Sequence, residues 1–221
     1  MMTNLFSTFD PSTSMNLSMN WLSVIMFTMM MPYMMWTTPS RYNKMMYNLM
    51  NMLFNELKMM MNNKKMLILF ISLFMLIMME NMMGLMPYIF TSTSHLVFSM
   101  SMSVPLWMTM MMYGWTKKSQ HMLSHLIPTG TPPLLMPFMV MIETISNMIR
   151  PGSLAVRLTA NMIAGHLLMS LLGNNMNESD NWMMPLILTI QMIMMMFETA
   201  VSMIQAYVFS VLSTLYTSEV N

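Results

Sequence analysis

Long apolar segments follow one another along this chain, and each is long enough to cross a lipid bilayer. They cover residues 17–36, 66–88, 96–115, 134–173 and 182–217. About 20 apolar residues suffice for one crossing. The charged fraction agrees with a membrane location, because it is 8% here and about 25% in soluble domains. The sequence therefore predicts an all-α polytopic membrane protein that forms a single membrane domain over residues 1–221.

Residues 41–62 form a different kind of segment. Their polar side chains recur at alternating intervals of three and four: Arg41, Lys44, Asn48, Asn51, Asn55, Lys58 and Asn62. This spacing places them in one stripe along a helix that is otherwise apolar. The pattern predicts an amphipathic helix that lies in the membrane interface and does not cross it.

The last two apolar segments, 134–173 and 182–217, are too long for an upright crossing. As helices they extend over roughly 60 and 54 Å, against a hydrocarbon core of about 30 Å. We therefore expect two long, steeply tilted membrane-embedded helices, with Pro151 as the point where the first would kink. Inclined helices that carry the deep ionisable residues indicate a partner beside them, and not a pore through a bundle.

The distribution of charged residues orients the predicted crossings. Five basic residues lie within 41–65, and Lys117 and Lys118 follow the next predicted hairpin. The positive-inside rule places these groups on the side of synthesis. The opposite side then receives Asp10, the turn 91–95 and the acidic loop of Glu178 and Asp180. We expect the N-terminus outside and the C-terminus inside.

Composition excludes several functional classes. A net charge of +1 provides no basic surface for a nucleic acid. Cysteine is absent, which removes disulfides, thiolate catalysis and cysteine-ligated metals. The phosphate-loop pattern Gly-x-x-x-x-Gly-Lys does not occur, so no nucleotide site of that kind is expected. His121 and His125 are four residues apart in an expected loop but lack a third ligand, so we expect neither a metal nor a cofactor.

Methionine is unusually frequent, at 45 residues, in lipid-facing and interfacial positions alike. Because methionine packs without strong shape demands, this excess is typical of a coding bias. An AT-rich organellar genome that reads an isoleucine codon as methionine would produce it. Synthesis inside an organelle also agrees with an N-terminal stretch that has neither a basic n-region nor an arginine-rich presequence.

Arg157 is a permanent charge inside an apolar segment, because arginine stays ionised at physiological pH. Such a charge costs at least a few kcal/mol at bilayer depth and is normally functional or paired. Glu143 and Arg150 precede it at intervals of seven and so share its helical face, which Asn161 extends. For Arg150, next to Pro151, a structural snorkelling role is the alternative. A fixed cation surrounded by titratable groups is what proton transport requires.

A second set of polar residues lies in the last segment. Glu198, Ser202 and Gln205 form a stripe at intervals of four and three. Packing of the two long helices would bring His166 and Asn161 to this stripe and make a hydrated wedge from the outer side. The carboxylate and arginine that precede Pro151 would line a separate region on the inner side. A satisfied buried histidine is the alternative for His166.

Several motifs together resemble subunit a of the mitochondrial F-type ATP synthase, in an arthropod-like version. They are Phe9-Asp-Pro11, Asn81-Met-Met-Gly-Leu-Met-Pro-Tyr88, Pro128-Thr-Gly-Thr-Pro132, Ile142-Glu-Thr-Ile-Ser146, Ile149-Arg-Pro151, Leu154-Ala-Val-Arg-Leu-Thr-Ala-Asn161, Ala164-Gly-His166 and Ile204-Gln-Ala-Tyr-Val-Phe209. The resemblance spans nearly the whole chain and is weakest over 41–65. It implies a multi-pass protein of the mitochondrial inner membrane that is a proton-channel subunit and not an enzyme on its own.

The resemblance also implies roles and partners. Arg157 would be the essential arginine that faces a rotating ring of small hairpin subunits, each with one membrane-embedded carboxylate. The outer access path would be lined by Asn161, His166, Glu198 and Gln205, and Glu143 would lie on the matrix path. Further implied partners are peripheral-stalk and accessory membrane subunits and the lipid bilayer.

Glu80 departs from the family pattern, which often has an uncharged polar residue at this position. Its position inside the second predicted crossing leaves three interpretations open: a lipid-interface residue, a helix-pairing residue or a functional one.

Three other functions fit a helical membrane protein. A passive stator or anchor has no need of deep ionisable groups such as Arg157, Glu143 and Glu198. A proton-pumping redox subunit requires pairs of haem-ligating histidines inside its helices or a quinone pocket. Only one histidine, His166, lies deep in a predicted membrane helix. A solitary ion channel is disfavoured by the expected lateral arrangement of the long helices.

Overall fold

The computed structural model describes residues 5–14, 17–29, 37–61, 64–127, 132–178 and 182–220, and these residues form helices and connecting loops without a β-strand. Some predicted features lie outside the described residues: 30–36 of the first crossing, Asn62 of the polar stripe, 128–131 of the proline-containing loop, and Asp180. The fold is that of an all-α polytopic membrane protein.

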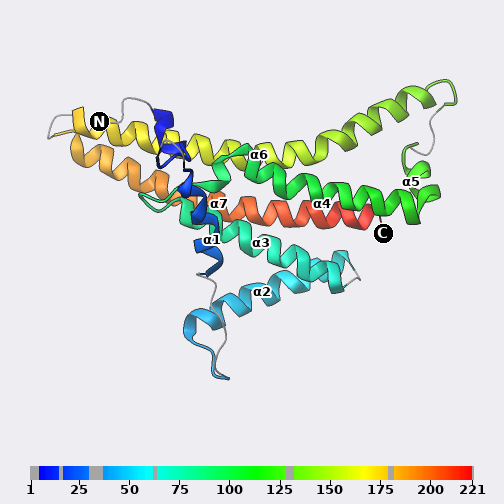
Figure 1. Ribbon diagram of the computed structural model, residues 1–221, viewed down its shortest axis with the longest axis horizontal. Coiled ribbons are helices and arrows are strands. Elements are labelled where there is room, and N and C mark those ends of the chain that lie inside the picture. Colours follow the sequence, from blue (N-terminus) through cyan, green and yellow to red (C-terminus); the bar gives the residue numbers. More distant parts are fainter. Residues whose placement is uncertain are drawn as a thin grey trace.

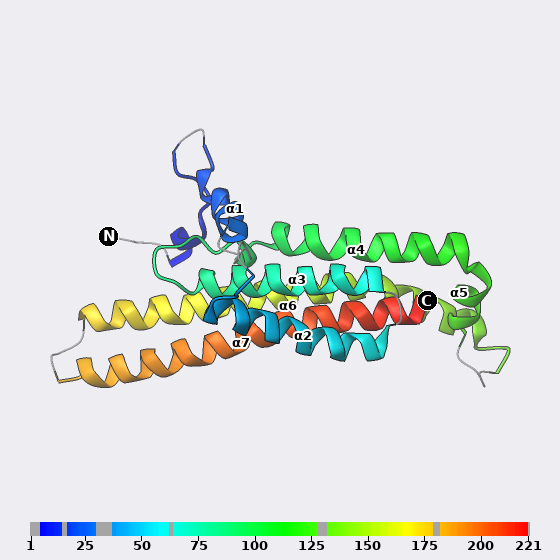
Figure 2. The same cartoon turned by 90° about the horizontal axis from the view of Figure 1, so that it is seen from below.

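Four long helices make up the main layer: α3 (Lys64–Gly84), α4 (Leu96–Lys117), α6 (Met136–Glu178) and α7 (Met184–Val220). Within the described residues, their spans 65–84, 96–117, 136–176 and 184–219 are long and apolar enough to cross a membrane. Figures 1 and 2 show them side by side, with α3 against α7, α4 against α6, and α6 against α7.

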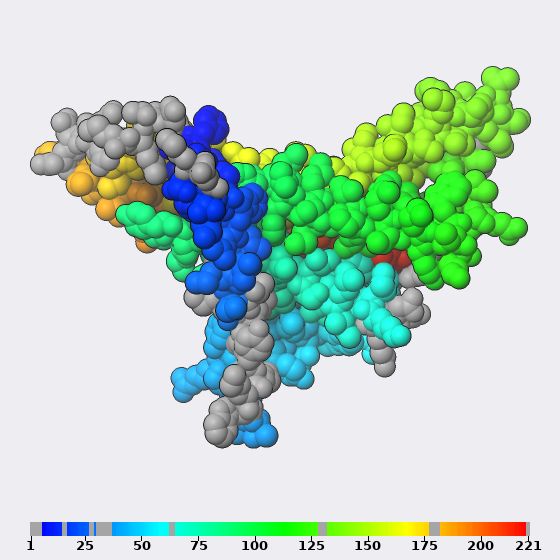
Figure 3. Space-filling view, viewed as in Figure 1, coloured from blue at the N-terminus to red at the C-terminus, as the bar shows by residue number. Residues whose placement is uncertain are grey.

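Helix α6 is a single helix of 43 residues with Pro151 in its interior, and it changes direction along its length (Figure 1). A proline inside a helix removes one backbone hydrogen bond and clashes with the preceding turn, which bends the helix. The first part of α6 therefore projects from one edge of the molecule, and α2 projects from the other (Figure 3).

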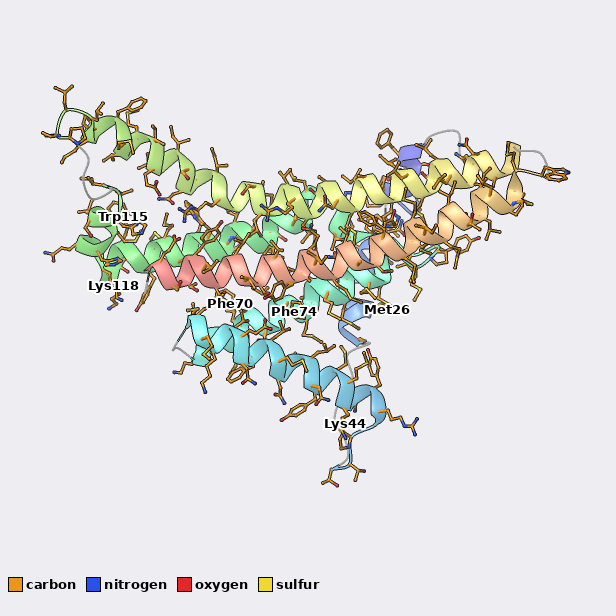
Figure 4. All side chains as sticks on the ribbon, turned by 180° about the vertical axis from the view of Figure 1, so that it is seen from behind. Met26, Lys44, Phe70, Phe74, Trp115 and Lys118 are labelled. Atoms are coloured by element: carbon orange, nitrogen blue, oxygen red, sulfur yellow. The ribbon has the colours of Figure 1, made fainter. Side chains whose placement is uncertain are left out.

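The amphipathic segment is helix α2 (Arg41–Met60). Ser40 caps its first turn, because the Ser40 hydroxyl oxygen accepts a hydrogen bond from the backbone N–H of Asn43 at 3.3 Å. The six described residues of the polar stripe are all exposed, and Lys44 points away from the other helices (Figure 4). Met46, Leu53 and Leu57 form the buried face, which packs on α3 and α7.

The core lies where α2, α3, α6 and α7 meet, and Phe70 and Phe74 of α3 are at its centre (Figure 4). Small hydroxyl residues let α7 approach its neighbours closely. Their hydroxyls are satisfied within the helix: Ser210 donates to the carbonyl of Tyr207, Ser213 to that of Ser210, and Thr217 to that of Thr214. Polar side chains are thus buried in an apolar helix without unpaired donors.

The described fold also contains two short α-helices and a 3-10 helix, η1 (Leu5–Phe9), near the N-terminus. Helix α1 (Leu22–Met29) follows a 3-10 turn at Met19–Trp21 and runs across the direction of the four long helices in Figure 1. Helix α5 (Ser119–His125) follows α4 directly. The loop expected around His121 and His125 is therefore wrong, because both residues belong to this helix.

The turn between α3 and α4 is exposed at Met86 and Tyr88 and buried in its second part. It contains a 3-10 helix, η3 (Ser92–Ser94), which packs against α3, α4 and α6. Thr91, Ser92, Thr93 and Ser94 are each at most 4% exposed. Non-helical backbone at membrane depth is tolerated where protein buries it or where it lines water, so this turn is compatible with a position below the membrane surface.

Candidate functional site

One cavity of about 650 Å³ joins parts of the chain that are distant in sequence. Its lining comes from the N-terminal segment 7–12 with Asn20, the loop 85–91 after α3, α6 and α7. His166 of α6 and Glu198 of α7 both line it, and both are half-buried. We call this cavity the outer cleft. The two titratable residues thus share one cavity between neighbouring helices.

The Glu198 carboxyl is placed by a glycine on the facing helix. A Cβ atom added to Gly165 would lie 2.9 Å from both Cδ and Oε1 of Glu198. Only a residue without a side chain therefore leaves room for the carboxyl against α6. The neighbouring His166 has its Nε2 atom buried without a hydrogen-bond partner among the described residues, and the Phe9 ring stands edge-on to its imidazole with centroids 6.3 Å apart.

The cleft lining includes residues that are absent from the sequence-based set, among them Gln191 and Asp10. Gln191 precedes Glu198 by seven residues, the same interval that separates Glu198 from Gln205. Extending this spacing toward the start of the helix would have identified Gln191 from the sequence. Asp10 enters from the N-terminal segment, which no periodicity connects to the long helices. The backbone N–H and the hydroxyl of Ser12 donate hydrogen bonds to the Asp10 carboxylate, and they hold its pKa below the ordinary value.

The remaining predicted outer-side residues do not line the described cleft. Ser202 is 1% exposed and faces α3, where its hydroxyl contacts the Met82 sulfur at 3.4 Å and its carbonyl accepts a hydrogen bond from Asn81 Nδ2 at 3.3 Å. Asn161 and Gln205 are half-buried on α6 and α7. Ser202 therefore holds α7 against α3 in this structure.

A second polar cluster lies near the C-terminal end of α7. Arg150 Nη1 donates to Glu219 Oε2 at 2.7 Å, and Arg150 Nη2 lies 3.6 Å from Glu143 Oε1. The guanidinium also stacks over the Tyr216 ring, 5.1 Å from its centroid. Arg150 thus joins Glu143 to the end of α7 and borders a small cavity of about 50 Å³ beside His125. Sequence spacing pairs the first two residues but gives no sign of Glu219.

Arg157 occupies a different environment from Arg150. Its side chain is exposed, and no described residue forms an ion pair with it. The exposed positions around it carry small residues, Ser153, Ala160 and Ala164. The surface beyond them is apolar on both long helices, as in Met148 at 72% exposure and Met196 at 73%. A permanent cation therefore stands on an unpartnered apolar surface where another helix has room to approach closely.

Metal ligands are not grouped in the described part of the chain. His121 and His125 have ring centroids 6.4 Å apart on α5, and no set of three or more His, Cys, Asp or Glu side chains converges among the described residues.

Ionisable side chains on long apolar helices are typical of membrane proteins that move ions or protons. The family model described as ATP synthase A chain matches residues 15–218, and the chain belongs to this family of membrane-sector subunits, which are not catalytic. It is 55% identical to proteins named ATP synthase subunit a from Drosophila simulans, Drosophila melanogaster and Anopheles quadrimaculatus, over all of both chains in each case.

Proposed function

We propose that this chain carries protons between two offset half-paths and the carboxylates of a rotating ring, with Arg157 between the paths. The observation that carries the proposal is the exposed Arg157 with no described partner on an apolar surface. An unpaired guanidinium in lipid is costly, so a carboxylate from a neighbouring subunit is the chemistry that this surface requires. A ring of small hairpin subunits, each with one embedded carboxylate, meets that requirement.

The outer half-path runs through the outer cleft. A proton enters from the aqueous side, passes the region of Glu198 and His166, and neutralises a ring carboxylate. The neutral carboxyl then enters lipid without the desolvation penalty of an ion. Asn161 and Gln205 extend this path toward the ring, and Ser202 supports it by holding α7 against α3.

The inner half-path begins at the cluster of Glu143, Arg150 and Glu219. After almost a full turn, a ring carboxyl releases its proton toward Glu143. Arg157 favours the ionised ring carboxylate and blocks direct passage of protons between the two paths, because a guanidinium does not deprotonate. The driving energy is about 2.3 kcal/mol per charge for each 100 mV, so several protons are needed for each ATP made by the separate catalytic head.

The proposed setting is the mitochondrial inner membrane, with the N-terminus in the intermembrane space and the C-terminus in the matrix. Besides the ring, the proposed partners are peripheral-stalk and accessory membrane subunits. The exposed apolar faces of α6 and α7 meet the ring and the lipid bilayer.

Passive proton flux through the membrane sector tests the path assignment. Glu198→Gln keeps the size of the side chain but cannot exchange a proton, so we expect flux to fall about tenfold or more in assembled complexes. Glu56→Gln is the matched control, because Glu56 is exposed on α2, where it accepts a hydrogen bond from Tyr207. Equal flux in the two variants would contradict the outer path.

A further inference from the structure

Glu80 is the most deeply buried carboxyl group of the described residues, at 2% exposure inside α3. Its Oε2 atom accepts a hydrogen bond from the Ser92 hydroxyl at 2.5 Å. Its Oε1 atom is buried and has no hydrogen-bond partner in the described part of the chain. Neither of the two described ion pairs includes it, since both belong to Arg150.

Such an environment is suited to a carboxylic acid and not to a carboxylate. A buried carboxylate needs a cation or several donors to offset its lost hydration. Glu80 has one hydroxyl donor and a second oxygen that accepts no hydrogen bond from a described group. A protonated Glu80 removes the charge, and one hydrogen bond then satisfies most of the group. These contacts fit a protonated Glu80 better than a charged one.

Ser92 is 1% exposed and lies one residue beyond the lining of the outer cleft. Thr91, its neighbour in the chain, lines the cleft together with Leu85. The end of α3 and this turn are closely apposed, because a Cβ atom at Gly84 would lie 3.2 Å from Thr91 Cγ2. Gly84 is one helical turn beyond Glu80. Glu80 thus lies just over one helical turn from Leu85 of the cleft lining, and its hydrogen-bond partner Ser92 follows Thr91 of that lining.

We propose that Glu80 is a further protonatable group of the outer path, stored neutral beneath the outer cleft, and that it exchanges its proton with cleft water through Ser92. On uptake, the Ser92 O–H bond breaks as an O–H bond forms at Glu80 Oε2, and Ser92 regains a proton from a cleft hydronium. The net change is one hydronium and one carboxylate giving one water and one carboxylic acid. Release is the reverse. This inference rests on the proposed outer path and adds a proton store to it.

Two variants separate proton exchange from packing. Glu80→Gln keeps the shape and an oxygen acceptor for Ser92 but holds no exchangeable acid, and Ser92→Ala removes the relay. In assembled complexes in vesicles we expect each to lower passive proton flux about fivefold, and the double variant to lose no more than either single one. Ser99→Ala is the matched control, because Ser99 is 1% exposed and its hydroxyl donates only to the Leu96 carbonyl.

Infrared spectra of the same complexes test the neutral acid directly. The wild type minus Glu80→Gln difference should contain the carbonyl band of a protonated carboxylic acid. That band should shift promptly on transfer to D2O, and the shift should be slowed in Ser92→Ala. Absence of the band, a band that does not shift, or unchanged flux in Glu80→Gln would each overturn the inference.

The Glu198→Gln variant separates this inference from the proposed function. Loss of flux in Glu198→Gln with normal flux in Glu80→Gln leaves the outer path intact and removes Glu80 from it. Normal flux in Glu198→Gln with loss in Glu80→Gln retains the role of Glu80 and removes the path through Glu198. Normal flux in both variants contradicts both.

Discussion

Arg150 and Arg157 are seven residues apart on α6, and the structure gives them opposite surroundings. Arg150 reaches across to α7, where Glu219 and Tyr216 hold its guanidinium. Arg157 stands exposed on an apolar surface with small residues around it. A shared helical face thus does not give a shared environment, because a long side chain takes whatever partner the neighbouring helix offers. Arg150 therefore connects α6 to α7, whereas Arg157 is available to a neighbouring subunit.

Gly165 gives a residue-scale prediction for the outer cleft. In Gly165→Ala, the new methyl group would displace the Glu198 carboxyl, since Cδ and Oε1 lie 2.9 Å from the Cβ position. The helix itself should gain up to about 1 kcal/mol from the substitution. We expect normal assembly and about tenfold lower proton flux, because the proton-accepting group is misplaced.

Gly173→Ala is the matched control for this substitution. Gly173 is on the same helix, and a Cβ atom there meets nothing within 4 Å. Its flux should stay at the wild-type level. If Gly165→Ala also conducts normally, the position of the Glu198 carboxyl against α6 does not matter for proton passage.

Residue spacing predicts part of the candidate site. It pairs Glu143 with Arg150, which the structure shows 3.6 Å apart, and packing of two long helices brings His166 and Glu198 to one cleft. It does not find Glu219 or Asp10. Both reach the site through tertiary contacts between segments far apart in sequence, and helical periodicity carries no information about such contacts.

At the scale of elements, the directions of the helices limit their depth in the membrane. Figures 1 and 2 show α3, α4 and α7 running in roughly the same direction, whereas α1 runs across them in Figure 1. Helix α7 has 37 residues and so is about 55 Å long. To fit a hydrocarbon core of about 30 Å, α7 must be strongly tilted. With the same tilt, α3 or α4, each about 32 Å long, would span only about 17 Å of the membrane depth.

The α3–α4 hairpin is therefore expected to turn inside the membrane and not at its surface. Thr93, at 0% exposure, is at this turn, and Trp182, at 93%, is at the turn between α6 and α7. A membrane-impermeant thiol reagent should label Trp182→Cys and leave Thr93→Cys unlabelled from either side. Rapid labelling of Thr93→Cys would place the hairpin turn in water.

The hydrophobic pattern of the sequence predicts where the helices are, but it does not predict how they are arranged. The three- and four-residue spacing of polar side chains locates α2, and the lengths of the apolar runs locate the four long helices. Segment length predicts a steep tilt only for the last two segments, whereas α3 and α4 run alongside them. The direction of a helix is set by the neighbours against which it packs, and those contacts are not periodic in sequence.

At the scale of the whole molecule, the described N-terminal segment packs against α6, and the end of α7 lies near α5 (Figure 1). With the basic residues of α2 and the end of α4 placed in the matrix, the N-terminus faces the intermembrane space. Cysteines at Lys117 and Glu178 should therefore react with an impermeant label from opposite sides. Labelling of both cysteines from the same side would contradict this topology.

The central claim is that Arg157 pairs with carboxylates of a rotating ring while it separates two proton paths. Its most direct test is ATP synthesis by assembled complexes under an imposed proton gradient. Arg157→Ala should lower synthesis by about 10²-fold or more, because the fixed charge at the ring is lost. Arg157→Lys should also severely impair ATP synthesis, because lysine lacks the planar guanidinium with its paired donors and can deprotonate. ATP synthesis near the wild-type rate in Arg157→Ala would contradict the account.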